Sequence, residues 1–165
     1  MVTESNMNTK IHELRREQLL PIGVEDAWKF FSRAENLSKI TPPELSFRIL
    51  TDLTDAPVYS GLKIDYTVKP LFGIPMRWTT EITGVNAPHV FTDRQLKGPY
   101  KLWEHTHTFE PVPGGVKMTD VVKYAMPLGI LGELGHSIIV RKKLDDIFEF
   151  RRSTLIKLLG DFKQS

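Results

Sequence analysis

The spacing of apolar residues changes once along this chain, and that change limits the folds it can adopt. Between Glu44 and Met126 apolar and polar residues alternate in short runs, most cleanly over 62–69. Side chains of a strand point to alternate faces, so this pattern predicts half-buried strands. From His136 to Leu159 apolar residues instead recur at helical spacing. The two patterns together predict a series of strands followed by one long helix.

Short turns and the start of the chain complete this prediction. Lys10–Leu20 is charged, which favours a strand at a sheet edge or with one solvated face. Val24–Phe31 opens with acidic residues and Asn36–Ile40 ends before two prolines, so both are expected to be short helices. A turn at 86–89 and the glycine-rich run 111–115 are typical of connections between antiparallel strands.

The expected architecture is an α+β domain with a curved antiparallel sheet of about six or seven strands. A helix of about 24 residues is roughly 36 Å long, which is enough to cover one face of such a sheet. The apolar stripe of this helix comprises Val140, Leu144, Ile147, Phe148, Leu155 and Leu158. A curved sheet that grips one helix seldom closes completely, so a cavity is expected between them.

Composition excludes several kinds of function. The chain has 165 residues, 41% of them hydrophobic, which fits one globular domain, expected over residues 10–162 after a mobile tail at 1–9. The net charge of +2 provides no electrostatic case for nucleic acid. No cysteine is present, which excludes disulfides and thiol chemistry. The polar start and the absence of a long apolar run predict no signal peptide and no membrane span, hence a cytoplasmic protein.

One predicted strand, within Lys97–Phe109, has two unlike faces. One face is polar and suits water: Leu102, Glu104, Thr106, Thr108 and Glu110. The other is aromatic and imidazole: Trp103, His105, His107 and Phe109. Since strand faces alternate, the second set is expected to line an enclosed space.

Pairing this strand with its neighbours brings carboxylates to the two histidines. Asp93 falls opposite His105, and Asp120 falls near His107. In the same register Gln95 and Tyr124 lie beside Trp103. A slip of two residues would move each partner by one position, but the same residues would still share the inner face.

Several short motifs also match a known group of proteins. They are Leu20-Pro21, Ala27-Trp28, Phe30-Phe31-Ser32, Asn36-Leu37, Ile40-Thr41-Pro42, Phe91, Asp93, Gln95, Gly98-Pro99-Tyr100, Trp103, His105, His107, Phe109, Asp120, Val122, Tyr124 and Pro127. With the order of elements, they resemble the helix-grip or START-like superfamily, also called SRPBCC, and within it the bacterial ligand-binding SRPBCC proteins related to polyketide cyclase/dehydrase-like proteins. The resemblance implies a helix-grip fold around a cavity. It names no ligand, because the superfamily contains carriers, sensors and enzymes.

The predicted ligand-binding wall combines sheet and helix residues. The sheet supplies Leu62, Ile64, Tyr66, Trp78, Phe91, Gln95, Trp103, His105, His107, Phe109, Val122 and Tyr124, and the helix supplies Val140, Leu144, Ile147 and Phe148. Arg151 interrupts the helix stripe and can either face the cavity, where it would meet a ligand carboxylate, or reach out to the edge. The glycine-broken loop Leu128–Gly135 is either a lid or a packed apolar loop.

The histidines and aspartates allow three interpretations. They can satisfy one another structurally, they can orient the polar head of a ligand, or they can act as general acid and base. His105, His107, Asp93 and Asp120 are therefore catalytic candidates, with none assigned. A His-x-His pair with a carboxylate is also a known metal site type, but the resemblance does not usually imply a metal, so neither a metal nor another cofactor is expected.

The leading expectation is a carrier or sensor that binds a hydrophobic or amphipathic small molecule without turnover. The alternative is a cyclase/dehydratase-type enzyme that uses His105 or His107 on a polyketide-like substrate. A third possibility is a module that binds a protein partner, which would have a filled core. A homodimer is possible through exposed apolar residues at the turn Leu71–Pro75.

Overall fold

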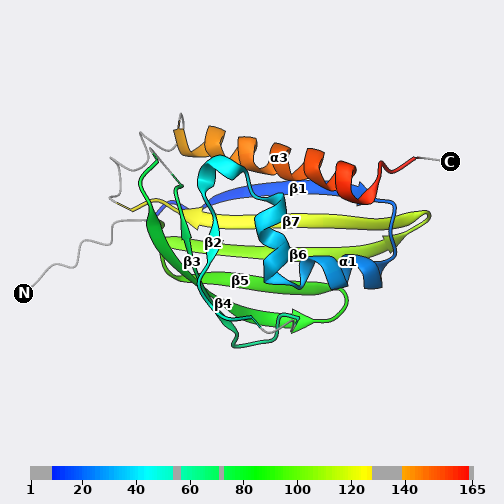
Figure 1. Ribbon diagram of the computed structural model, residues 1–165, viewed down its shortest axis with the longest axis horizontal. Helices are drawn as coiled ribbons and strands as arrows, with labels where there is room; N and C mark the ends of the chain where they lie inside the picture. The colour runs from blue at the N-terminus through cyan, green and yellow to red at the C-terminus, as the bar shows by residue number, and fades with distance from the viewer. Residues whose placement is uncertain (1–8, 54–56, 71–72, 128–138, 164–165) are drawn as a thin grey trace, which may run out of the picture.

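A seven-stranded antiparallel sheet with the strand order β1-β7-β6-β5-β4-β3-β2 forms the body of the protein (Figure 1). The structure is a computed structural model and describes residues 9–53, 57–70, 73–127 and 139–163. The strands are β1 (His12–Leu20), β2 (Arg48–Ile49), β3 (Lys63–Val68), β4 (Met76–Asn86), β5 (Val90–Lys97), β6 (Leu102–Val112) and β7 (Gly115–Ala125). The helical elements are α1 (Val24–Phe31), η1 (Ala34–Ile40), η2 (Pro43–Leu45) and α3 (Arg141–Leu159).

The predicted antiparallel meander is confirmed, since β3 to β7 follow one another both along the chain and across the sheet. β1 pairs with β7 and forms an edge of the sheet, one of the two positions predicted from its charge. The turn between β6 and β7 is tight, because Val112 pairs with Gly115 and Gly114 takes a φ of +83°.

The region before β3 differs from the prediction. The alternation of Leu45, Phe47 and Ile49 indicated a strand, but Leu45 belongs to η2 and β2 has only two residues. Proline at positions 42 and 43 and a left-handed Ser46 (φ 47°) bend the backbone away from a strand. The alternate spacing of Leu45, Phe47 and Ile49 therefore reflects their burial on a folded turn and not a strand. The second short helix is confirmed as a 3₁₀ segment, η1.

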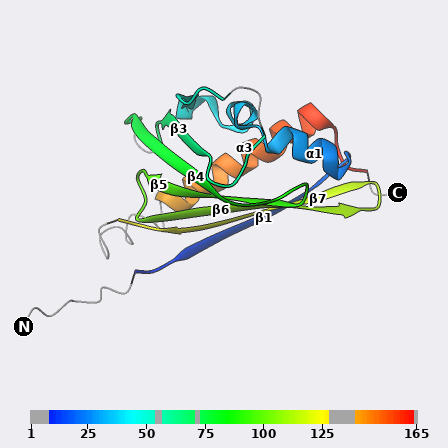
Figure 2. The ribbon, with the colours of Figure 1, turned by 90° about the horizontal axis from the view of Figure 1, so that it is seen from below.

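Helix α3 crosses the sheet on the same face as α1, and Figure 2 shows both helices on one side of the strands. It buries Leu144, Phe148, Arg151 and Leu155. Leu158 was expected on this stripe, but half of its surface is exposed (50%), and Leu159 packs against the core instead. Gly160 caps the C-terminal end of α3, with a φ of +97°. Residues 136–138, expected in this helix, lie outside the described residues.

The faces of β6 are as predicted. His105, His107 and Phe109 are buried and Trp103 is half-buried, whereas Glu110 on the other face is exposed. The inner face of β6 therefore points toward the helices. No helix in the described ranges is both long and apolar enough to cross a membrane.

Candidate functional site

Two neighbouring cavities lie between the inner face of the sheet and the helices. The larger has about 150 Å³ of space for the centres of water molecules, and the smaller, nearer the start of α3, has about 110 Å³. Phe47, Tyr66, Trp78, Trp103, His105 and Arg151 line both. The two spaces therefore share part of their walls.

Most of the predicted wall residues line one of the cavities. Those on the larger are Ile64, Tyr66, Trp78, Phe91, Trp103, His105 and His107, together with Asp93. Those on the smaller include Val140, Leu144, Ile147 and Phe148 from the α3 end of the chain. The cavity expected between sheet and helix is therefore present, and strand alternation identified much of its wall.

Five predicted wall residues, Leu62, Gln95, Phe109, Val122 and Tyr124, line neither cavity. Phe109, Val122 and Tyr124 are fully buried, because helices pack directly onto their part of the sheet. Leu62 lies before β3 and packs against the core. Gln95 holds the turn 97–101, where its amide donates to the Tyr100 carbonyl at 2.7 Å and accepts the Tyr100 N–H at 3.4 Å.

The sequence-based wall omitted the side of the cavity built by the first helices. The omitted lining residues are Phe30, Phe31, Arg33, Ala34, Asn36, Leu37, Ile40, Phe47, Ile49, Val58, Thr80 and Ile82. The sequence predicts an apolar face on helix α1, and such a face must pack against another part of the protein. Its contact with the open end of the sheet depends on the path of the chain, which the spacing of residues does not reveal.

The predicted cross-strand register at the histidines is confirmed. Asp93 pairs with His105 across β5 and β6, and His107 pairs with Asp120 across β6 and β7. Trp103 pairs with Tyr124 as expected. The register between β5 and β6 is described only as far as Arg94 with Glu104, one residue short of the pair expected between Gln95 and Trp103.

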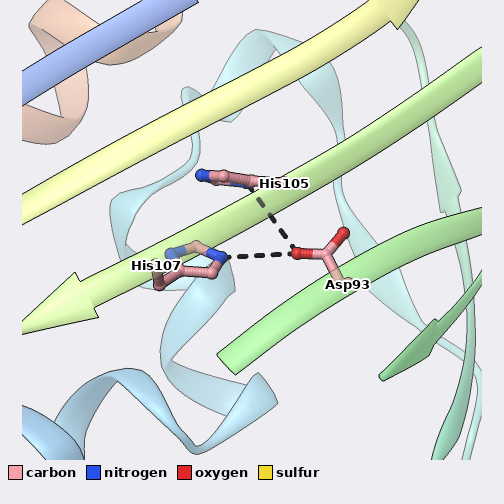
Figure 3. A group of neighbouring side chains, drawn as sticks. All are labelled: Asp93, His105 and His107. Atoms are coloured by element: carbon pink, nitrogen blue, oxygen red, sulfur yellow. Dashed lines mark hydrogen bonds and ion pairs between the residues drawn. The ribbon is translucent and has the colours of Figure 1, made fainter. Parts of the chain in front are cut away.

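The side-chain hydrogen bonds join diagonal neighbours instead of the residues that are directly opposite, so each histidine contacts both carboxylates. His105 Nε2 donates to Asp120 Oδ1 at 2.8 Å. His107 Nε2 donates to Asp93 Oδ2 at 3.3 Å, as Figure 3 shows. His105 Nδ1 lies 3.8 Å from Asp93 Oδ2. His107 Nδ1 lies 2.9 Å from Asp120 Oδ1, but at an angle that makes no hydrogen bond. The two imidazole centroids are 3.8 Å apart.

Arg151 reaches this cluster from α3. It is 7% exposed, and one of its terminal nitrogens lies 3.4 Å from Asp120 Oδ1. Its guanidinium carbon lies 4.8 Å from the centroid of the Phe148 ring. Its Nε is buried without a hydrogen-bond partner among the described residues. Of the two positions open to it from the sequence, Arg151 takes the one that faces the cavity.

Burial and charge set the protonation of the cluster. Burial and the neighbouring His107 lower the pKa of His105. Burial also acts to lower the pKa of His107, but its contacts with Asp120 and Asp93 outweigh burial and raise that pKa. Burial opposes the charge of Asp120, yet Arg151 and the two histidines hold the pKa of Asp120 well below its usual range. As pH falls, His107 is therefore expected to take up a proton before His105 does.

Comparison with known proteins shows that the sequence of this chain matches one protein family. A family model described as "Polyketide cyclase / dehydrase and lipid transport" matches residues 20–147. No curated protein matches the chain.

Solved structures share the fold at low sequence identity. Protein Ms6760 from Mycobacterium smegmatis is 18% identical with a TM-score of 0.63, over 91% of this chain and 98% of that one. A point mutant of norcoclaurine synthase from Thalictrum flavum, in complex with a transition-state analogue, is 14% identical with a TM-score of 0.63, over 92% and 98%. Ara h 8.0201 is 14% identical with a TM-score of 0.58, over 90% and 99%. These likenesses confirm the predicted helix-grip fold.

Proposed function

Because the chain belongs to the polyketide cyclase/dehydrase and lipid transport family, we propose that its cavity carries an amphipathic small molecule without chemical turnover. The observation that supports this most directly is a mostly apolar cavity in which His105, His107 and Arg151 bring buried polar groups together, while Arg33, Asn36 and Thr80 add polar groups from other elements. Ligand pockets commonly combine an apolar lining with a few converging polar groups that fix orientation. The partner-binding alternative expects a filled core, so the cavity favours a small molecule.

The lining sorts into an apolar part and a polar part. Side chains from α1, η1 and the neighbouring strands, such as Phe31, Leu37 and Ile82, offer apolar surface. His105, His107 and Arg151 border the same space from β6 and α3. An apolar body is therefore proposed to lie near the first helices, with its polar group toward β6.

Arg151 indicates the chemistry of that polar group. Its buried Nε has no acceptor among the described residues, and an unsatisfied buried donor costs about 1–3 kcal/mol. Arg151 also borders the cavity, and its guanidinium can bind an oxygen acceptor on the ligand, such as a carboxylate or a carbonyl. The proposed cargo is therefore a lipid-like or polyketide-like molecule with an acceptor oxygen at one end.

Native mass spectrometry of protein purified from its own cells, followed by organic extraction, tests the proposal. We expect one co-purifying mass that is recovered unchanged after prolonged incubation. The affinity of the cavity is measured with anilinonaphthalene sulfonate, which has an apolar body and an anionic head. A bare protein that also fails to bind this probe would contradict the proposal.

Two adjacent positions provide a matched pair of variants. Ile49 lines the larger cavity, whereas Leu50 is 48% exposed and lines neither cavity. Ile49→Trp should fill part of the cavity and weaken probe binding about tenfold or more, and Leu50→Trp should leave it unchanged. Equal effects of the two variants on probe binding would indicate that the probe binds outside the larger cavity.

The second candidate function is a cyclase/dehydratase-type enzyme. It is favoured by one observation: both imidazoles border the cavity and each contacts a carboxylate. Such groups can transfer protons to and from a bound substrate. A new mass that forms from the extracted ligand, and fails to form with His105→Gln or His107→Gln, would support the enzyme and exclude a pure carrier.

The oligomeric state stays a prediction. Ile74 at the turn before β4 is 59% exposed, while the neighbouring Leu71 and Phe72 lie outside the described residues. The loop 128–135, expected to be either a lid or a packed apolar loop, also lies outside them.

A further inference from the structure

We propose that Asp93, His105 and His107 form a binding site for one divalent transition-metal ion at the wall of the larger cavity. This departs from the sequence-based expectation of no metal. The site borders the cavity of the proposed cargo but does not depend on it, because the three ligands come from the protein alone.

The ligand atoms converge on one point. His105 Nδ1 and His107 Nε2 both face Asp93 Oδ2, at 3.8 and 3.3 Å, as Figure 3 shows. The three atoms all lie within 4.8 Å of one another. Bonds of about 2.0–2.1 Å in a tetrahedral arrangement place ligand atoms about 3.3–3.4 Å apart. Shifts of a few tenths of an ångström to about 1.5 Å would therefore seat an ion.

The other nitrogen of each imidazole is directed to one carboxylate. His105 Nε2 hydrogen-bonds to Asp120 Oδ1 at 2.8 Å, and His107 Nδ1 lies 2.9 Å from the same oxygen. A metal-bound histidine almost always donates its remaining N–H to a carboxylate, a carbonyl or water, which orients the ring. Asp120 thus positions the His105 ring through this hydrogen bond and lies close to the His107 ring without hydrogen-bonding to it, and Arg151 beside it balances its charge.

A purely structural role, in which the buried histidines and aspartates satisfy one another's hydrogen bonds, explains these contacts less completely than a metal site does. A purely structural cluster needs one good acceptor for each imidazole, and Asp120 and Asp93 supply these. It does not explain why His105 Nδ1 lies 3.8 Å from Asp93 Oδ2, which is beyond hydrogen-bond distance. A metal ion would use this nitrogen.

The donor set identifies the class of ion. Two imidazoles and one carboxylate suit Zn²⁺, Fe²⁺ or Co²⁺, whereas Mg²⁺ and Ca²⁺ prefer oxygen ligands. All three residues line the larger cavity, so the remaining coordination positions face it. A ligand oxygen could occupy one of them.

The test uses untagged, chelator-treated protein and Co²⁺ or Zn²⁺ alone. We expect dialysis followed by elemental analysis to give one bound ion per chain. Co²⁺ should also produce visible absorption bands of a four- or five-coordinate site. Asp93→Asn and His107→Gln should each weaken binding at least tenfold, and Asp120→Asn should weaken it about 10–100-fold.

Matched controls are His12→Gln and His89→Gln, which alter histidines outside the cluster and should bind the ion like the parent. Asp93 is 19% exposed, so Asp93→Asn is expected to fold even where a histidine variant does not. Absence of stoichiometric uptake by folded parent protein overturns the proposal. So does uptake that survives Asp93→Asn and His107→Gln, or that disappears in a control. Probe binding, measured separately in chelator, reports on the proposed cargo function.

Discussion

Asp120 holds the polar side of the cavity together. Its Oδ1 lies within 3.4 Å of side-chain nitrogens of His105, His107 and Arg151, and the residue is 1% exposed. A buried carboxylate in such a position stabilises the fold only while its partners are present, because each partner would otherwise be a buried charge or an unsatisfied donor.

Asp120→Asn should therefore lower the free energy of unfolding by about 3–5 kcal/mol, the usual cost of breaking a buried ion pair. Urea unfolding measures this loss. Asp146→Asn is the control, since Asp146 forms an ion pair with Lys142 at 2.8 Å but is 56% exposed. That variant should lose less than about 1 kcal/mol. Equal losses of unfolding free energy in the two variants would show that the buried cluster contributes no more stability than an exposed ion pair.

The two histidines should respond to pH in opposite directions. The raised pKa of His107 means that the folded state holds its proton more tightly than the unfolded chain, whose value is 6.5. Its contribution to stability is complete below that value and is lost as pH rises through the folded pKa. The lowered pKa of His105 means that the unfolded chain gains a proton first as pH falls, so His105 destabilises the fold below pH 6.5.

Nuclear magnetic resonance titration of the imidazole protons, in chelator, measures both values. We expect the His107 signals to titrate above 6.5 and the His105 signals below it. The stability advantage of the parent over His107→Gln should shrink as pH rises through the folded pKa of His107. Two rings that titrate together at the ordinary value would contradict the described contacts.

At the scale of elements, α3 stabilises the fold through a narrow stripe. Leu155 is completely buried in the core that includes Leu20 and Phe109, while Leu158, almost one turn later, is half exposed. The exposed side of the helix carries ion pairs such as Lys142 with Asp146. Such pairs contribute little stability, so the hold of α3 on the sheet depends on its buried stripe.

Leu155→Ala should destabilise the protein by about 2–5 kcal/mol, because it removes buried surface and leaves a cavity. Leu158→Ala makes the same chemical change in the same helix and should cost less than about 1 kcal/mol. Thermal or urea unfolding of both variants measures the difference. Similar losses would indicate that the helix is rotated relative to the described packing.

At the scale of the whole molecule, one sheet supports several buried clusters. Trp28 belongs to the cluster beneath α1, and Trp78 belongs to the cluster beside the smaller cavity. Strands β3, β4 and β6 each carry residues of both cavities, so the two regions share a scaffold. The single domain expected over residues 10–162 stays a prediction, and the shared scaffold suggests how to test it.

The protein should therefore unfold in one cooperative transition. Far-UV circular dichroism and tryptophan fluorescence should give the same midpoint in urea. A variant that keeps only Trp28 and one that keeps only Trp78 should share that midpoint after correction for their own stabilities. Separate midpoints within one variant would indicate two units that unfold independently.

The sequence by itself determined most of the elements, apart from the region before β3, and the inner face of β6. Alternation depends only on the geometry of a strand, so His105, His107 and Phe109 were correctly expected to be buried on one face. Tight turns of known length also determined the register, which correctly placed Asp93 opposite His105 and Asp120 opposite His107.

Only the tertiary structure decided which groups meet. Side chains of paired strands can reach diagonal neighbours. His105 therefore hydrogen-bonds to Asp120 and His107 to Asp93, although the register places His105 opposite Asp93 and His107 opposite Asp120. The cavity wall from α1 and η1, the role of Gln95 in a turn and the outward position of Leu158 have the same origin. Each depends on where distant segments pack, and residue spacing carries no information about that packing.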